Sequence, residues 1–490
     1  MSNQISKSEL ESYLWGSAVL LRNHIDAGAY KQYIFPLLFF KRLNDVYEEE
    51  TDKAVEANGQ EAADWEEIHT FCIPDRARWE NVRSKTQNVG KAIQSAFRAL
   101  ENANDAFQGI FGDGTWTNKK RLPDRLLKDL MEHFSTKTLS LESLPEDELG
   151  NGYEYLIKKF ADDSGHTAQE FYTNRTVVHL MTEMLKPESG ESIYDPTCGS
   201  AGMLISSIAY LRSKKKEWRN VSLYGQEINA LTSAIARMNC ILHGIKDFNI
   251  ANGDTLAAPA FVDGNGLKQF NLVLANPPYS IKEWNRAAFS KDKYGRNFLG
   301  TPPQGRADYA FFQHILASMD NKNGRCAILF PHGVLFRNEE KELREKLVCS
   351  GMLECVVGLA PNLFYNAPME ACIVICRKKK PDAHKGHVLF INAVNEVTRK
   401  NAESNLEPEH IEKITKAYEN FKTDGIFAKK VSVREIESNA FSLSIPLYVK
   451  DLNLHTAVDT RSLQERFEEW QSASRETNRC FDNINKFLEE

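Results

Sequence analysis

The sequence predicts an α/β fold in which a parallel, doubly wound sheet follows a helical N-terminal region and precedes a C-terminal helix. Three patterns carry this prediction. Residues 1–150 have the apolar spacing of helices, and residues 153–377 alternate short apolar runs with helical stretches. Residues 463–488 have apolar positions spaced alternately by four and three. We therefore divide the chain into a helical domain, residues 1–150, an α/β domain, residues 151–450, and a C-terminal helix, residues 451–490.

Composition and charge narrow the classes of protein to consider. The chain has 490 residues, 42% of them hydrophobic and 26% charged, which is typical of a soluble protein of two or three domains. It has neither a membrane-length apolar run nor a signal peptide, so we expect a cytoplasmic protein that does not contact membrane. Nine scattered cysteines without zinc-site spacing predict free thiols and no metal.

The net charge of −6 is unusual for a protein that grips duplex DNA alone, because phosphate neutralisation dominates such binding. Either the chain does not bind nucleic acid, or a partner supplies much of the positive surface.

The helical N-terminal region has a predicted start but no catalytic cluster. Ser8 and Glu11 have the spacing of a capping box ahead of an apolar stripe. We interpret the region as a structural or partner-binding domain.

The α/β region contains the strands and helices that define the sheet. The clearest predicted strands are residues 193–194, 222–224, 272–274 and 326–330, and the clearest helices between them are residues 201–212 and 230–242.

The strongest chemical motif is Asn276-Pro277-Pro278-Tyr279, directly after the strand-like run 270–275. An exocyclic amine on an aromatic ring is a poor nucleophile because its lone pair is delocalised. The amide oxygen of Asn276 and the main-chain oxygen of Pro277 can accept both amine hydrogens and favour a pyramidal nitrogen. The prolines restrict φ and so fix that carbonyl, and Tyr279 offers a flat face for an extruded base. The alternative is a proline-rich turn that only ends a strand.

Three further motifs follow predicted strands. Asp195 opens a glycine-rich turn, and its carboxylate can meet the ammonium of an amino-acid-like cofactor. Glu227, one strand–helix–strand unit later, can bind ribose hydroxyls, and Asp254 can accept from an adenine amine. Each acid alone is more often a solvated loop carboxylate. Because all of them close successive predicted strands, we expect them to line one edge of the sheet with Asn276. The glycine-rich turn that Asp195 opens contains Gly199, Ser200, Ala201 and Gly202, which we also expect to bind the cofactor.

These motifs, in this order, resemble the γ class of amino-methyltransferases, and the whole chain resembles the modification subunit of a type I restriction–modification system. Similar blocks occur at residues 40–45, 305–308, 330–337 and 362–365. In the family, the segment upstream of the glycine-rich turn folds over the methionine part of the cofactor; here it is Glu170, Phe171, Tyr172, Thr173, Asn174 and Arg175. Two residues depart from the pattern: Asn174 stands where proline is usual, and Ala201 where glycine is common.

The resemblance implies a Rossmann-like, S-adenosylmethionine-dependent methyltransferase domain that methylates the N6 amine of adenine in double-stranded DNA. It implies catalytic roles for Asn276, Pro277, Pro278 and Tyr279, and cofactor-binding roles for the acids, the turn and the upstream segment named above. It also implies a specificity subunit that reads the sequence, a restriction subunit, and a second copy of this chain. The C-terminal helix is where we expect the specificity subunit to dock.

Three alternatives stay open at this point. A protein glutamine methyltransferase uses the same Asn-Pro-Pro-Tyr logic on a side-chain amide. A self-contained adenine methyltransferase would need no partner. A scaffold protein could keep the fold without catalysis, although the intact motif argues against that.

Overall fold

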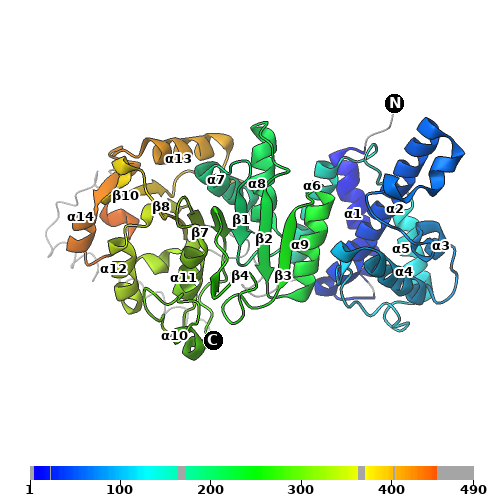
Figure 1. Ribbon diagram of the computed structural model, residues 1–490, viewed down its shortest axis with the longest axis horizontal. Helices are drawn as coiled ribbons and strands as arrows, with labels where there is room; N and C mark the ends of the chain where they lie inside the picture. The colour runs from blue at the N-terminus through cyan, green and yellow to red at the C-terminus, as the bar shows by residue number, and fades with distance from the viewer. Residues whose placement is uncertain are drawn as a thin grey trace, which may run out of the picture.

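The computed structural model describes residues 5–449, apart from residues 23, 164–172, 362, 364–369 and 401–402. The predicted C-terminal helix over 451–490 lies outside the described residues, as do Glu170, Phe171 and Tyr172. Figure 1 shows two parts side by side, a bundle of helices and a helix-covered sheet. None of the described helices is long and apolar enough to cross a membrane.

The N-terminal domain is helical, as predicted. Its helices are α1 (Lys7–Leu21), α2 (Lys31–Asn58), α3 (Trp79–Arg83), α4 (Val89–Ala103) and α5 (Asp124–Phe134), followed by α6 (Glu146–Asp163). Buried aromatic rings fill its core: Phe97, for example, stacks on Phe111 with ring centroids 4.2 Å apart and meets Phe40 edge-on. Residue 150, where we drew the domain boundary, lies within α6.

The predicted start of α1 was wrong by two residues. Ser6 is the N-cap and forms the capping box with Glu9, whose carboxylate accepts from the Ser6 N–H at 3.0 Å. Two serines, at positions 6 and 8, each precede a glutamate by three residues, so the sequence offers two registers. The N–H of Ile5 also bonds to the Ser143 carbonyl at 3.3 Å, which ties the chain down just before the earlier register.

The α/β part contains one nine-stranded sheet, in the order β13-β10-β8-β9-β7-β6-β1-β2-β3. All four predicted strands are confirmed. The strands are β1 (Ser192–Asp195), β2 (Ser222–Glu227), β3 (Phe248–Asn252), β6 (Leu272–Ala275), β7 (Arg325–Pro331), β8 (Leu353–Leu359), β9 (Ala371–Arg377), β10 (His387–Ala393) and β13 (Ala428–Ser432). Two small hairpins lie apart from it: β4 (Val262–Asp263) with β5 (Gly266–Leu267), and β11 (Thr398–Lys400) with β12 (Glu403–Asn405).

The sheet is mixed rather than parallel throughout, so that part of the prediction was wrong. β9 runs antiparallel to both β7 and β8, and β13 runs antiparallel to β10. Only residues 360–370 join β8 to β9, a connection too short for the crossover that a parallel neighbour needs. The five strands that carry the predicted motifs or their neighbours, β7-β6-β1-β2-β3, are parallel to one another.

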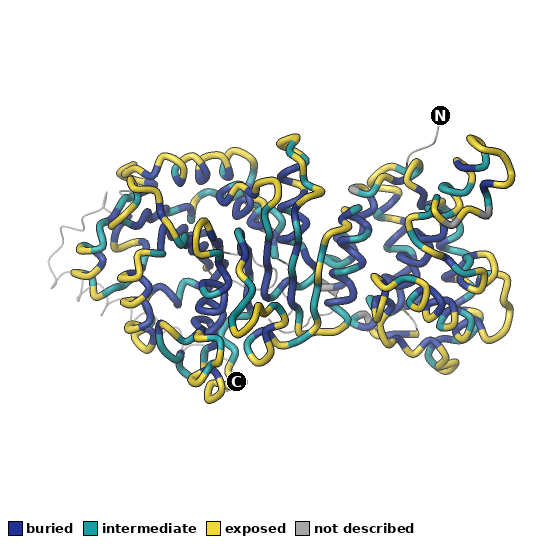
Figure 2. Tube along the Cα trace, viewed as in Figure 1, coloured by how far each residue is buried: buried dark blue, intermediate teal, exposed yellow. Residues whose placement is uncertain are grey.

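Helices cover both faces of the sheet, which confirms the doubly wound arrangement (Figure 1). In β6, Leu272 and Leu274 enter one core while Val273 and Ala275 enter the other. One face is packed by α7 (Arg175–Leu185), α8 (Gly202–Ser213), α9 (Ala230–Leu242) and α13 (Pro408–Asn420). The other carries α11 (Asp308–Ser318), α12 (Lys341–Cys349) and α14 (Val433–Ser438), and α10 (Arg286–Ser290) lies in the connection between β6 and α11. The central strands β6, β7 and β8 are buried throughout between these layers, which Figure 2 shows in dark blue.

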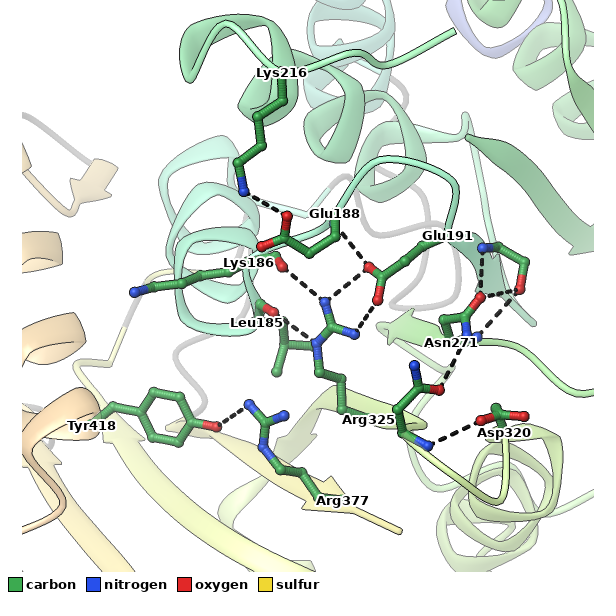
Figure 3. Close-up of polar contacts among 12 residues, drawn as sticks. Leu185, Lys186, Glu188, Glu191, Lys216, Asn271, Asp320, Arg325, Arg377 and Tyr418 are labelled. Atoms are coloured by element: carbon green, nitrogen blue, oxygen red, sulfur yellow. Dashed lines mark hydrogen bonds and ion pairs between the residues drawn. The ribbon is translucent and has the colours of Figure 1, made fainter. Parts of the chain in front are cut away.

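At the end of the sheet where the parallel strands begin, one arginine makes hydrogen bonds to several segments. Arg325, the first residue of β7, pairs with both carboxylate oxygens of Glu191, at 2.6 and 2.9 Å (Figure 3). It also donates to the carbonyls of Leu185 and Lys186, each at 2.8 Å. This network fastens the end of α7 to the starts of β1 and β7.

Candidate active site

The predicted polar residues meet at the opposite end, where the strands finish. Asp195 ends β1 and Glu227 ends β2, while Asp254 follows β3 and Asn276 follows β6. Because β6, β1, β2 and β3 are neighbours in this order, the four side chains share one edge of the sheet, as the sequence predicts.

The glycine-rich turn after β1 has open space beside its backbone. Gly199 has φ +52°, and no described atom lies within 4 Å of the position that a Cβ would take. This backbone can therefore come close to a ligand. The turn is held from behind, since Asn239 of α9 donates to the Ser200 carbonyl at 2.9 Å and the Cys198 N–H bonds to the Gln226 carbonyl at 3.0 Å.

A small cavity of about 60 Å³ lies between this turn and the start of α7. Asp195 lines it, accepts from the Thr197 N–H at 3.0 Å and is 2% exposed. The pKa of Asp195 is raised to about 7, mainly because the carboxyl group is buried and in smaller part because the Glu227 carboxylate lies nearby. Arg175 also lines the cavity; it pairs with Glu154, and burial lowers its pKa to about 9. The cavity thus brings together the carboxyl group of Asp195 and the guanidinium of Arg175.

Two carboxylates face a larger cavity of about 830 Å³. Glu227 accepts from the N–H groups of Gly199 at 3.1 Å and Asn229 at 2.9 Å. Asp254 accepts from the N–H groups of Leu256 at 2.8 Å and Ala257 at 3.1 Å. Main-chain donors therefore fix the orientation of both carboxylates.

The Asn276–Tyr279 motif lies where the two cavities meet, because Asn276 lines both. Its amide nitrogen donates to the Thr173 hydroxyl at 2.8 Å, and its amide oxygen accepts from the Tyr279 hydroxyl at 2.6 Å. Burial raises the pKa of Tyr279 well above its ordinary value, so this phenol is neutral at physiological pH. The Asn276 amide oxygen has two lone pairs, so it can accept from a substrate amine as well as from the Tyr279 hydroxyl.

Two helices, α2 and α6, form one wall of the larger cavity. Lys31 and Phe35 of α2, and Ile157 and Phe160 of α6, lie across from the sheet edge. Sequence analysis missed this wall, because nothing in the helical pattern distinguishes these positions from an ordinary core. A cavity of this size is large enough for a drug-sized ligand.

Sequence analysis also missed Arg296, which is 2% exposed. Its guanidinium pairs with Asp292 at 2.6 Å and donates to the carbonyls of Thr255 at 3.0 Å and Leu256 at 2.8 Å. Arg296 therefore fixes the loop that carries Asp254. It lies in a polar segment with no motif, so no signal in the sequence points to it.

Two predicted cofactor-binding residues line neither cavity. Asn174 caps α7 by accepting from the Thr176 N–H at 2.9 Å, and donates to the Ser404 carbonyl at 2.8 Å. Ala201 is fully buried at φ +67° and precedes α8. The other described members of the predicted set do line a cavity: Thr173, Arg175, Asp195, Gly199, Ser200, Gly202, Glu227, Asp254, Asn276, Pro277, Pro278 and Tyr279.

Comparisons with known proteins give the family. Residues 145–456 match the family described as N-6 DNA Methylase, and residues 10–134 match the one described as HsdM N-terminal domain. The chain belongs to the N-6 DNA methylases, as a type I restriction–modification methylase subunit. It is 32% identical to the type I restriction enzyme MjaVIII methylase subunit of Methanocaldococcus jannaschii, over 99% of this chain and 85% of that relative. It is 30% identical to the HindI methylase subunit of Haemophilus influenzae, over 77% of this chain and 89% of the relative.

A solved structure supports the same assignment for this methylase. The type I restriction–modification methyltransferase subunit from Streptococcus thermophilus is 30% identical and superposes with a TM-score of 0.80. The match covers 91% of this chain and 100% of that one.

The family implies S-adenosylmethionine as methyl donor, and the residues of this methylase fit it. The small cavity pairs Arg175 with Asp195, which suits the carboxylate and ammonium of an amino-acid end. The open turn at Gly199 and the two oriented carboxylates beyond it suit a nucleoside.

Proposed function

We propose that this methylase subunit transfers a methyl group from S-adenosylmethionine to the N6 amine of adenine in double-stranded DNA. The observation that carries the proposal is the position of Asn276. This residue lines the small cavity suited to an amino-acid end and also the larger cavity that can take a base. One side chain can therefore touch both reactants.

The chain's own residues would align the amine. The amide oxygen of Asn276 and the main-chain oxygen of Pro277 accept the two amine hydrogens, and Tyr279 stacks on the flipped base. S-adenosylmethionine supplies a methyl group on a sulfonium, which makes that methyl electrophilic. As the amine nitrogen bonds to the methyl group, the methyl–sulfur bond would break and leave a neutral thioether. The new bond makes the nitrogen more acidic, and it would then give up one proton to solvent. The residues contribute mainly alignment and oriented dipoles.

Other residues would hold the donor. Asp195, once ionised, meets its ammonium, and Arg175 its carboxylate. Glu227 accepts from the ribose hydroxyls, and Asp254 from the adenine amine. The buried position of Asp195 strengthens this attraction because little water screens it.

We further propose that the chain acts in the cytoplasm, in a complex with a specificity subunit, a restriction subunit and a second copy of itself. The net charge of −6 supports a separate subunit that supplies most of the positive DNA-binding surface. The apolar spacing over residues 463–488 supports a C-terminal docking helix for the specificity subunit.

The test is transfer of labelled methyl from S-adenosylmethionine to mixed-sequence duplex DNA. The chain is assayed alone and with its co-expressed genomic neighbour, beside Asn276→Ala. We expect N6-methyladenine only with the neighbour present, and none from the variant. Label on DNA from the chain alone would refute the need for a partner, and label on protein instead of DNA would refute the substrate.

A further inference from the structure

Two sequence blocks that the proposed chemistry does not use come together next to the Asn276–Tyr279 motif. Residues 305–308 end in Asp308, the first residue of α11, and residues 330–337 end in Arg337, just beyond β7. Asp308 is fully buried. One of its carboxylate oxygens accepts from the main-chain N–H of Ser280 at 2.8 Å, and the other accepts from the Arg337 guanidinium at 2.8 Å.

Ser280 is the residue directly after Tyr279, and its backbone is in the left-handed region, with φ +52°. A residue with a side chain adopts this conformation at a cost, so it persists where neighbouring groups hold it. The bond to Asp308 holds it here, and the Arg306 guanidinium lies 3.4 Å from the Ser280 hydroxyl. The turn that ends the motif is therefore fixed from outside.

Arg337 is itself held in one position. Its main-chain carbonyl accepts from the Arg344 guanidinium at 2.6 Å, and its guanidinium lies 3.6 Å from a carboxylate oxygen of the buried Glu340. A Cβ on Gly333 would lie 2.4 Å from the Arg337 Nε, so only glycine leaves room for this guanidinium. The carboxylate of Asp308 thus has a fixed cation on one side and the Ser280 N–H on the other.

We propose that Asp308, held by Arg337, is a positioning residue that sets the conformation of Ser280 and thereby the orientation of the amine acceptors on Asn276 and Pro277. This inference rests on the proposed function. It adds a role for Asp308 and Arg337, which line neither cavity. Alignment is the main catalytic contribution we assign to the motif, and a displacement of about 1 Å is enough to slow such a reaction roughly 100-fold.

The experiment uses the full chain with its co-expressed specificity subunit and compares three variants. Asp308→Asn keeps an oxygen for Ser280 but removes the charge that Arg337 holds in place. The double variant Asp308→Asn/Ser280→Gly puts glycine where the left-handed backbone no longer needs support. Glu191→Gln is the matched control, because it breaks a buried arginine–carboxylate pair at the other end of β7 (Figure 3).

Three quantities are measured for each variant: kcat for methyl transfer to DNA, the affinity for S-adenosylmethionine, and hydrogen exchange of the peptide over residues 276–284. We expect Asp308→Asn to lower kcat roughly 100-fold, to leave the affinity within about twofold, and to speed exchange in that peptide. Adding Ser280→Gly should recover at least about tenfold in kcat. Glu191→Gln should change none of the three.

The inference is overturned if Asp308→Asn leaves both kcat and exchange unchanged, if Ser280→Gly recovers nothing, or if Glu191→Gln lowers kcat as much as Asp308→Asn. Failure of the proposed function would look different. The wild-type complex would then methylate no DNA, while exchange over residues 276–284 would still report whether Asp308 holds the turn.

Discussion

Two buried charges at opposite ends of the sheet, Arg325 and Asp195, have contrasting surroundings. Where strands begin, Arg325 places its guanidinium between two carbonyls and both oxygens of Glu191, so each of its three nitrogens donates to an acceptor (Figure 3). Where strands end, Asp195 is buried next to another carboxylate, and its pKa is raised to about 7. The charge of Arg325 is paired within the fold, whereas Asp195 lies in surroundings that disfavour its ionised form and that a cationic ligand would improve.

The largest effect should come from Asn276→Ala at the carboxyl end. Loss of the amide oxygen removes an oriented acceptor, and we expect methyl transfer to fall by roughly 100- to 1,000-fold. The fold should persist, because Asn276 is only partly buried and borders two cavities. Label transfer to DNA measures the first point, and an unchanged urea midpoint checks the second. A variant that transfers methyl at the wild-type rate would contradict the proposed role.

The next effect should come from Glu191→Gln at the amino end, and it should appear in stability instead of catalysis. Removing one partner of a buried pair leaves an uncompensated guanidinium, which destabilises by about 3 kcal/mol. The side chains of Arg325 and Glu191 are 7% and 12% exposed, so water cannot replace the lost charge. Urea unfolding measures the change. A loss of methyl-transfer activity per folded molecule would contradict the prediction that the amino end affects stability alone.

A third prediction concerns the pH dependence of S-adenosylmethionine binding. The ammonium of the cofactor is attracted by the ionised form of Asp195, whose pKa is raised to about 7. Affinity should therefore be highest between about pH 7 and pH 8, where Asp195 is ionised and an α-amino group still largely carries its proton, and should fall about tenfold for each pH unit below 7. Calorimetric titration from pH 5.5 to 8.5 measures this dependence.

The control for that titration is Asp195→Asn, which should bind the cofactor weakly at every pH and remove the pH dependence.

The folding stability of the cofactor-free protein should change with pH in the opposite direction. Because burial raises the pKa of Asp195, its contribution is fully present below the ordinary aspartate value and is lost as pH rises through 7.

The smallest effect should come from Lys216→Ala. This variant breaks an exposed ion pair at the amino end, so comparing it with Glu191→Gln tests whether burial makes an ion pair important for stability. Lys216 pairs with Glu188 at 2.7 Å, but the two side chains are 36% and 56% exposed (Figure 3). Solvent screening makes such pairs weak, so stability should change by no more than about 0.5 kcal/mol. A loss in urea unfolding as large as that of Glu191→Gln would contradict this explanation.

The sheet edge was predictable from sequence because strand, turn and polar residue follow one another along the chain. Asp195, Glu227 and Asn276 each end or follow a short apolar run, and parallel strands bring such positions together. The antiparallel β9 was not predictable, because its apolar run, residues 371–377, is equally compatible with either direction.

Contacts between distant segments were beyond sequence analysis. Asn174 bonds to Ser404, 230 residues away, and so serves as a cap and tether where a cofactor contact was expected. Arg296 and the wall from α2 and α6 are likewise set by tertiary packing. Neither the spacing nor the composition of those segments differs from that of ordinary loop or core.

α9 belongs to two hydrophobic cores at once. Ala236 and Cys240 pack with the sheet, whereas Ile235, Met238 and Leu242 pack with the N-terminal helices (Figure 1). Melting either core would expose the other face of this helix, so the two regions should lose structure in one cooperative transition. A protease cut between them would therefore not release two fragments that each refold unaided.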